Sequence, residues 1–141
     1  MRIIVLEGMP NKGKTHTMWL LRDILTSLAI GGVSTALTIY GSGIVSPKND
    51  FEDIIINYKS LKIGIYSQGD YSNYLASEIR KFEKLGCDVL VCTLSLNTLK
   101  INANKAINRF SNTRVPKTVE PIKALQINAN NADASAIFSL I

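Results

Sequence analysis

The feature that most constrains this chain is an eight-residue segment, Gly8–Thr15, with the sequence Gly-Met-Pro-Asn-Lys-Gly-Lys-Thr. The apolar run Ile3–Leu6 before it is typical of a buried strand, and Thr15–Ala29 after it has apolar residues at helical spacing. The two glycines allow a tight turn whose backbone N–H groups point inward at an anion. The start of the following helix adds unpaired N–H groups and the positive end of its dipole. The segment therefore predicts a strand, an anion-binding loop and a helix in succession.

This segment matches the pattern G-x-x-x-x-G-K-[ST] and resembles the phosphate-binding loop of the P-loop NTPase superfamily. The resemblance implies that Lys14 contacts the β- and γ-phosphates of a nucleotide and that the Thr15 hydroxyl ligates Mg²⁺. A turn that only joins a strand to a helix is the alternative. We expect His16, the only histidine, to have a structural or solvated role, although it belongs to the same segment. The expected nucleotide-binding residues are Gly8, Met9, Pro10, Asn11, Lys12, Gly13, Lys14, Thr15 and His16.

An acidic residue further along the chain is a candidate second ligand for Mg²⁺, in addition to Thr15. The apolar run Lys62–Tyr66 ends in Ser67-Gln68-Gly69-Asp70, and a carboxylate at such a strand end would hold Mg²⁺ opposite Thr15. Asp70 and Lys14 are therefore the candidate catalytic residues. Asp70 also directly precedes a helical pattern, so an N-cap is an equal alternative. Gln68 could orient an attacking water, but a polar strand terminus is favoured.

The pattern along the chain predicts the remaining elements. Only Lys59-Ser60-Leu61 separates Phe51–Tyr58 from Lys62–Tyr66, so we expect an antiparallel hairpin, with a helix over Phe51–Tyr58 as the competing interpretation. The acids at its start, Asp50, Glu52 and Asp53, are expected to be solvated. Other strands are expected at Arg2–Glu7, Ser34–Tyr40, Asp88–Leu94 and Thr118–Ile127, the last at an edge because of Pro121. Helices are expected at about Gly13–Ile30, Tyr71–Leu85 and Leu96–Ser111, with a closing helix capped within Asn128–Asn131. Their buried faces would comprise Met18, Leu21, Leu25 and Leu28, then Leu75, Ile79, Phe82 and Leu85, and finally Ala136, Ile137 and Leu140.

Strands that alternate with helices predict an α/β fold. We expect one domain over residues 1–141, a three-layer α/β/α arrangement like that of P-loop NTPases, with a mostly parallel sheet of about five strands and a possible antiparallel hairpin. Ligands of such sheets bind beyond the carboxyl ends of the strands, where Gly8–Thr15, Ser67–Asp70 and the loop after Leu94 would meet. P-loop proteins often place a nucleotide- or substrate-sensing segment where Gly41–Asn49 lies, but a plain surface connection is favoured.

Composition agrees with a globular domain. The chain has 141 residues, of which 46% are hydrophobic and 19% charged, enough for a buried core and unlike a disordered chain. No apolar run reaches the ~18 residues of a membrane span. A strand that opens directly into the glycine loop leaves no room for a signal peptide, and the spacing of Cys87 and Cys92 is not that of metal ligands. We therefore expect a reducing cytoplasmic location.

The net charge of +5 favours polyphosphate ligands, but the lysines are scattered, so nucleic-acid binding is unsupported. The sequence allows a protein partner or an oligomer but identifies neither. Arginines and lysines in and after Leu96–Ser111 could close over a phosphate, although scattered surface cations are commoner. These residues are Lys100, Lys105, Arg109 and Arg114.

Two further resemblances are partial. Glu7-Gly8 is similar to the entry of the loop in thymidylate and deoxynucleoside kinases, but a strand-end carboxylate bonded to nearby backbone is favoured for Glu7. Asn104-Lys105-Ala106-Ile107 half-resembles the guanine-reading N-K-x-D of GTPases, with Ile107 in place of the acid, so ATP is preferred over GTP. The resemblance as a whole implies a Mg²⁺-dependent nucleoside-triphosphate hydrolase that cleaves the β–γ bond. A small phosphotransferase and a nucleotide-occupied binding module with little turnover are the alternatives.

Overall fold

A seven-stranded mixed sheet forms the centre of the protein, as a computed structural model of residues 1–27 and 29–141 shows. Its strands are β1 (Arg2–Gly8), β2 (Val33–Ser34), β3 (Thr38–Ile39), β4 (Phe51–Tyr58), β5 (Leu61–Tyr66), β6 (Val89–Ser95) and β7 (Asn112–Pro116). They lie in the order β2-β4-β5-β6-β1-β7, and β3 also pairs with β4. Strands β5, β6, β1 and β7 run parallel, whereas β4 is antiparallel to β5, and β2 and β3 are antiparallel to β4.

The hairpin of β4 and β5 confirms the antiparallel prediction and shows that the competing helix over Phe51–Tyr58 is wrong. Its turn places Lys59 at φ 50° and Ser60 at φ 60°. Two successive positive φ angles match the twist of the flanking strands. The hairpin brings the start of β4 beside the end of β5.

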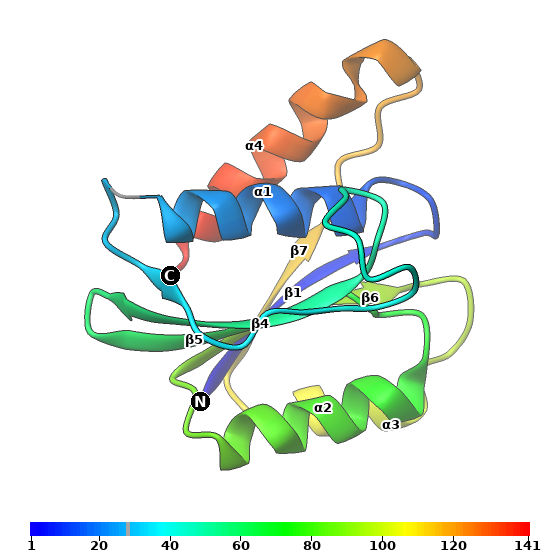
Figure 1. Cartoon of the computed structure of the whole chain (residues 1–141). Helices are drawn as coiled ribbons and strands as arrows, with labels where there is room; N and C mark the ends of the chain where they lie inside the picture. The colour runs from blue at the N-terminus through cyan, green and yellow to red at the C-terminus, as the bar shows by residue number, and fades with distance from the viewer. Residues whose placement is uncertain (28) are drawn as a thin grey trace.

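Four helices lie on the two sides of the sheet (Figure 1). Helices α1 (Lys14–Thr26) and α4 (Gln126–Ser139) pack together on one side, and α2 (Ser72–Lys84) and α3 (Ile101–Ile107) pack together on the other. A short 3₁₀ turn, η1 (Lys123–Leu125), precedes α4. Because β5, β6, β1 and β7 are parallel neighbours, the loops that follow them gather at one edge of the sheet.

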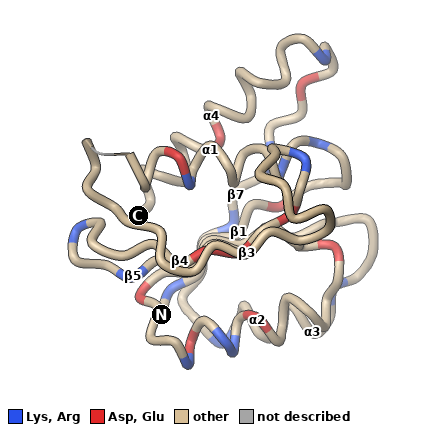
Figure 2. The backbone as a smooth tube through the Cα atoms, in the orientation of Figure 1, with Lys and Arg blue, Asp and Glu red and all other residues tan. Residues whose placement is uncertain are grey.

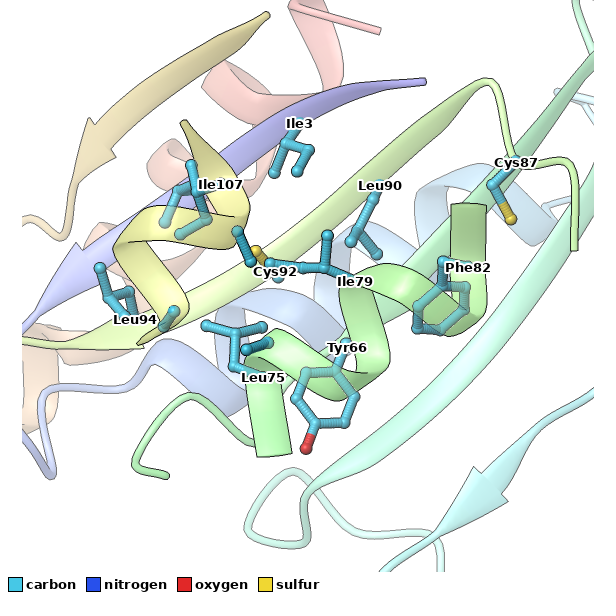
Figure 3. Packing of buried hydrophobic residues seen from close by; sticks show 14 of the residues in the cluster. Ile3, Tyr66, Leu75, Ile79, Phe82, Cys87, Leu90, Cys92, Leu94 and Ile107 are labelled. Atoms are coloured by element: carbon cyan, nitrogen blue, oxygen red, sulfur yellow. The ribbon is translucent and has the colours of Figure 1, made fainter. Parts of the chain in front are cut away.

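Alternate residues of the strands supply two buried clusters, one on each face of the sheet. Figure 3 shows the cluster under α2 and α3, where Leu75, Ile79 and Phe82 cover Leu90 and Cys92. The other cluster joins the apolar faces of α1 and α4 to Ile4, Leu6, Val89 and Val91. Strand β6 is buried along its whole length, in agreement with its continuous apolar run.

The predicted helix faces are largely confirmed. The first two apolar faces are buried at Met18, Leu21, Leu25, Leu75, Ile79 and Phe82. The prediction that Leu85 is buried is wrong, because this residue follows α2 and is 40% exposed. Leu28 lies outside the described residues. Of the closing helix, Ile137 is buried, but Ala136 and Leu140 are exposed.

Four predicted elements are wrong in extent or position. Ser34–Tyr40 forms the two short strands β2 and β3 rather than one strand. The predicted strand Thr118–Ile127 is absent from the described chain, since β7 lies earlier and α4 begins at Gln126. Strand β7 was missed because this half-exposed edge strand has no apolar run. Helix α3 covers only Ile101–Ile107 of the predicted Leu96–Ser111, and α1 ends at Thr26.

Among the described residues, no helix is long and apolar enough to cross a membrane. Figure 2 shows Lys and Arg distributed over helices, strand ends and loops rather than along one side of the fold. The dispersed pattern agrees with the scattered lysines of the sequence.

Candidate phosphate-binding site

A cavity of about 710 Å³ opens at the carboxyl ends of the parallel strands. Part of the Gly8–Thr15 segment forms one wall, and the loop after β5 and the end of the Gly41–Asn49 loop form the others. Gly8, Met9 and Lys12, although expected to bind nucleotide, do not line the cavity. The structure thus brings Lys14, Thr15 and Asp70 together, as the sequence predicted. The lining residues are Pro10, Asn11, Gly13, Lys14, Thr15, His16, Ser46, Pro47, Lys48, Asp50, Ser67, Gly69 and Asp70.

The backbone of the segment turns tightly where it meets α1. Asn11 has φ 60° and Gly13 has φ 87°, and Gly13 is the N-cap of the helix. No side chain caps α1, and its first turn contains no acid. The first N–H groups of a helix have no partner within it, so this end of α1 presents donors and a positive dipole to the cavity.

Both glycines also have a packing role that needs no ligand. A Cβ atom at Gly8 would lie 2.8 Å from Cβ of Lys117, and one at Gly13 would lie 2.5 Å from Oδ1 of Asn130. The loop is therefore pressed between the end of β7 and helix α4. Glycine at these positions is explained by packing as well as by anion binding.

Lys14 is a buried cation without an acidic partner. The residue is 7% exposed, and its Nζ donates to the carbonyl oxygens of Gly8 (3.0 Å) and Met9 (2.7 Å). Burial lowers the pKa of Lys14, and the nearby charges of Asp70 and Asp50 oppose that effect. No ion pair of Lys14 occurs among the described residues, whereas the buried Lys117 lies 2.6 Å from a carboxylate oxygen of Asp133. An anion in the cavity would supply the missing charge.

Asp50, expected to be solvated, instead faces Thr15. The Thr15 hydroxyl donates to Oδ1 of Asp50 (2.7 Å), and the Ser67 hydroxyl lies 3.0 Å from the same oxygen. Burial raises the pKa of Asp50 and the charge of Asp70 adds to this, while the two hydroxyl groups oppose it. The hairpin explains the position, because it places the residue before β4 beside the residue after β5. The predicted hairpin already implies that Asp50 lies beside Ser67, and this is the one sequence signal that points to Asp50 as a site residue.

Asp70 lines the cavity without capping α2. Its carboxylate accepts a hydrogen bond from the Ser95 hydroxyl at the end of β6. The N-cap of α2 is Tyr71, which makes no side-chain cap, so the N-cap interpretation of Asp70 is wrong. A Cβ atom at Gly69 would lie 2.3 Å from the Thr93 carbonyl oxygen, so glycine is needed to bring Asp70 this close to β6.

Other candidates are engaged elsewhere. The Glu7 carboxylate pairs with Arg114 of β7 rather than with backbone, so Arg114 is not free to close over the cavity. Gln68 accepts a hydrogen bond from the Tyr66 hydroxyl (3.2 Å) and does not line the cavity. Lys105 and Arg109 are exposed on and after α3.

The Gly41–Asn49 loop is more than a surface connection, because Ser46, Pro47 and Lys48 line the cavity. The indole Nε1 of Trp19 donates to the Asn49 carbonyl oxygen (2.8 Å) and ties the end of this loop to α1. The loop and the Thr15–Asp50 contact are thus adjacent.

The oxygen atoms of the cavity suit Mg²⁺, which prefers one or two carboxylates completed by phosphates and water. Two carboxylates, Asp50 and Asp70, line it, and so do three hydroxyl groups, those of Thr15, Ser46 and Ser67. No group of three or more His, Cys, Asp or Glu side chains able to hold a metal occurs in the described part of the chain. The residues therefore fit a metal that arrives with a phosphate ligand rather than a metal held by protein alone.

Comparison with protein-family models, with curated proteins and with solved structures finds no match to this chain. The resemblance to P-loop NTPases depends on the Gly8–Thr15 segment, and it stays a prediction.

Proposed function

We propose that this protein binds a magnesium nucleoside triphosphate in the cavity and hydrolyses it at the β–γ bond. The observation that carries the proposal is the buried Lys14, which forms no ion pair within the described chain and lies at the start of a helix that no side chain caps. A bound polyanion would supply the charge that Lys14 lacks and would accept hydrogen bonds from the helix start. A three-layer P-loop NTPase-like fold and a cytoplasmic location form part of the same proposal.

The residues have separate roles in this proposal. Lys14 exchanges its contacts with the Gly8 and Met9 carbonyl groups for the β- and γ-phosphates, and the N–H groups of the loop hold the remaining oxygens. Thr15, Asp50 and Asp70 would hold Mg²⁺, which when bound neutralises charge on the phosphate oxygens. Positioning and charge stabilisation supply the rate enhancement. ATP is preferred over GTP, because the guanine-reading tetrad lacks its acid.

The second candidate is a binding module with little turnover. It is favoured by the absence of arginine from the described lining of the cavity and by the Glu7–Arg114 pair, which occupies the nearest predicted arginine. Phosphoryl transfer to a small molecule in place of water is a third candidate, since a second cavity adjoins the first.

Titration calorimetry and phosphate release with Mg-ATP test the proposal. Lys14→Ala should weaken ATP binding by at least about tenfold, because a charge-assisted contact to phosphate contributes roughly 1.5–3 kcal/mol. The exposed Lys84→Ala, at the end of α2 and outside the lining of the cavity, is the control and should change affinity by less than about threefold. Equal losses in both variants, or wild-type protein that binds no nucleotide at millimolar concentration, would contradict the proposal. Binding without release would select the binding module.

A further inference from the structure

A second cavity, of about 690 Å³, adjoins the first, and Asp70 lines both. Its walls come from the start of α2 and from the loop between β6 and α3. The residues that matter here are Gln68, Tyr71, Tyr74, Thr98, Leu99 and Lys100. Its volume lies within the range of roughly 300–1,000 Å³ that small-molecule sites occupy.

Lys100 is a buried cation in the wall of this cavity. It is 4% exposed, and its Nζ donates to the neutral oxygens of Asn97 (Oδ1, 2.9 Å) and Thr98. Among the described lysines, Lys14, Lys100 and Lys117 are buried, and of these three only Lys117 forms an ion pair. A buried charge without a partner is costly, so an anion beside Lys100 would be stabilised. Lys14 and Lys100 thus mark the two adjoining cavities.

The wall formed by the start of α2 is aromatic and exposed. Tyr71 and Tyr74 are 56% and 61% exposed, and their ring centroids lie 5.5 Å apart in an edge-to-face arrangement. Leu99, next to Lys100 in the wall formed by the loop between β6 and α3, is 89% exposed. Neither ring is needed by the two buried clusters, which do not include them. Exposed aromatic faces next to a recessed cation suit a ligand with a flat ring and a negative group.

We propose that this second cavity binds a small aromatic molecule that carries a phosphate or similar anionic group. The anion lies against Lys100, and the ring packs against Tyr71 and Tyr74. Asp70 is the one acid in the described lining of this cavity, and its negative charge would oppose an anionic ligand. That charge is partly offset on the side of the first cavity, where the Ser95 hydroxyl donates a hydrogen bond to the carboxylate and Lys14 lies nearby. The inference takes from the proposed function only the occupant of the neighbouring cavity.

Titration calorimetry with the full chain tests this site, using phenyl phosphate and thymidine monophosphate as probes. Each is measured on free protein and on protein with saturating Mg-ADP, which occupies the first cavity if the proposed function holds. Both probes should bind in both conditions, and inorganic phosphate and thymidine alone should bind at least about tenfold more weakly. Lys100→Gln should weaken probe binding by about tenfold or more, and Tyr74→Ala should weaken it several-fold. Lys105→Gln, at an exposed lysine of α3, is the matched control and should behave as wild type.

Several outcomes would overturn the inference. These are no heat with either probe at millimolar concentration, unchanged affinity in Lys100→Gln, or binding that Lys14→Ala removes and Lys100→Gln does not. Should Lys100→Gln fail to fold, unchanged affinity in the exposed-site variant Tyr74→Ala decides against it. If an apolar peptide binds this surface with the same affinity in Lys100→Gln as in wild type, the surface is a site for a protein partner instead. If Mg-ADP fails to bind while the probes bind free protein through Lys100, the proposed function falls and this inference stands.

Discussion

At the scale of single residues, the Thr15 hydroxyl is hydrogen-bonded to Asp50, an acid that precedes a strand rather than follows one. The carboxylate is partly withdrawn from water and lies near the charge of Asp70, so folding raises its pKa. A native structure that keeps two acids close together near neutral pH loses stability at that position. A cation bound between Asp50 and Asp70 would restore this stability, so the effect of the pair on thermal stability can be measured.

Asp50→Asn should raise the thermal stability of the ligand-free protein and lower its affinity for Mg-ATP. The amide keeps the shape and removes the charge, and ~1 kcal/mol would shift Tm by about 4 °C in a chain of this length. The expected loss of Mg-ATP affinity is about tenfold or more, from one charge-assisted contact. Thermal melts and calorimetry measure the two effects. A variant that is less stable and binds Mg-ATP normally would show that Asp50 is structural only.

The same substitution predicts a pH dependence. Because the pKa of Asp50 is raised in the folded state, the native protein binds this proton more tightly than the unfolded chain does. The destabilisation is present above the raised pKa and is relieved as the pH falls through that value toward the unfolded pKa of about 4. The difference in Tm between Asp50→Asn and wild type should therefore be largest near neutral pH and should vanish below about pH 4. A difference that is constant from neutral to acidic pH would exclude the charge as its cause.

At the scale of elements, the Gly41–Asn49 loop, helix α1 and the start of β4 meet at one indole ring. Trp19 is the only tryptophan in the chain, and its ring lies 4.1 Å from that of Phe51, centroid to centroid. Its Nε1 donates a hydrogen bond to the carbonyl oxygen of Asn49, the residue before Asp50. A ligand that separates Thr15 from Asp50 acts on this contact directly.

Mg-ATP should therefore change the tryptophan emission of the unmodified protein. The expected result is a saturable change in intensity or wavelength, with a midpoint equal to the calorimetric Kd. Lys14→Ala should move that midpoint to higher concentration and leave the emission of the free protein unchanged. Constant emission at a concentration where calorimetry proves saturation would show that the loop does not respond to the nucleotide.

Helix α2 approaches the sheet closely where β5 has Gly64. A Cβ atom there would lie 2.5 Å from Cδ1 of Phe82, closer than real atoms pack. Gly64→Ala should cost about 1–3 kcal/mol of unfolding free energy, the usual range for overpacking, and leave Mg-ATP affinity within about twofold. Urea unfolding measures the loss. The double variant Gly64→Ala/Phe82→Leu should recover part of it, and no recovery would mean that strain arises elsewhere.

At the scale of the whole molecule, one ion pair joins the end of β7 to α4. Lys117 and Asp133 are 5% exposed each, and Asp133 also accepts the backbone N–H (2.9 Å) and the hydroxyl (2.6 Å) of Thr118. The same helix places Asn130 against Gly13. Helix α4 therefore supports the Gly8–Thr15 segment from behind, although nearly the whole chain separates them in sequence.

Asp133→Ala should destabilise the protein by about 3–5 kcal/mol, because it leaves Lys117 buried and uncompensated. Urea unfolding tests this, with Asp23→Ala as the control, since the Asp23 side chain is 68% exposed and should contribute less than about 1 kcal/mol. Lys117→Met/Asp133→Leu should recover much of the stability, because a buried pair is often replaceable by apolar residues. Equal stability of Asp133→Ala and Asp23→Ala would contradict a structural role for the pair.

The sequence by itself determined the features that depend on neighbours along the chain. Local periodicity and short connections were enough to predict β1, the Gly8–Thr15 segment, the start of α1, the hairpin, α2 and β6, because each is decided within a few consecutive residues. Lys14, Thr15 and Asp70 were placed at one edge of the sheet because parallel strands end together.

Only the tertiary structure decided which distant residues meet at that edge. Asp50 reaches Thr15 through an antiparallel register, α4 lies behind Gly13, and β7 pairs with β1 although its residues carry no apolar signal. The sequence does not distinguish Lys100 from the other lysines and arginines near it, whereas the structure shows that it is buried in a cavity that Tyr71 and Tyr74 also line. The physical reason is common to all four: burial and pairing between segments far apart in sequence depend on how the sheet is ordered and the helices pack, and no local pattern of residues encodes that.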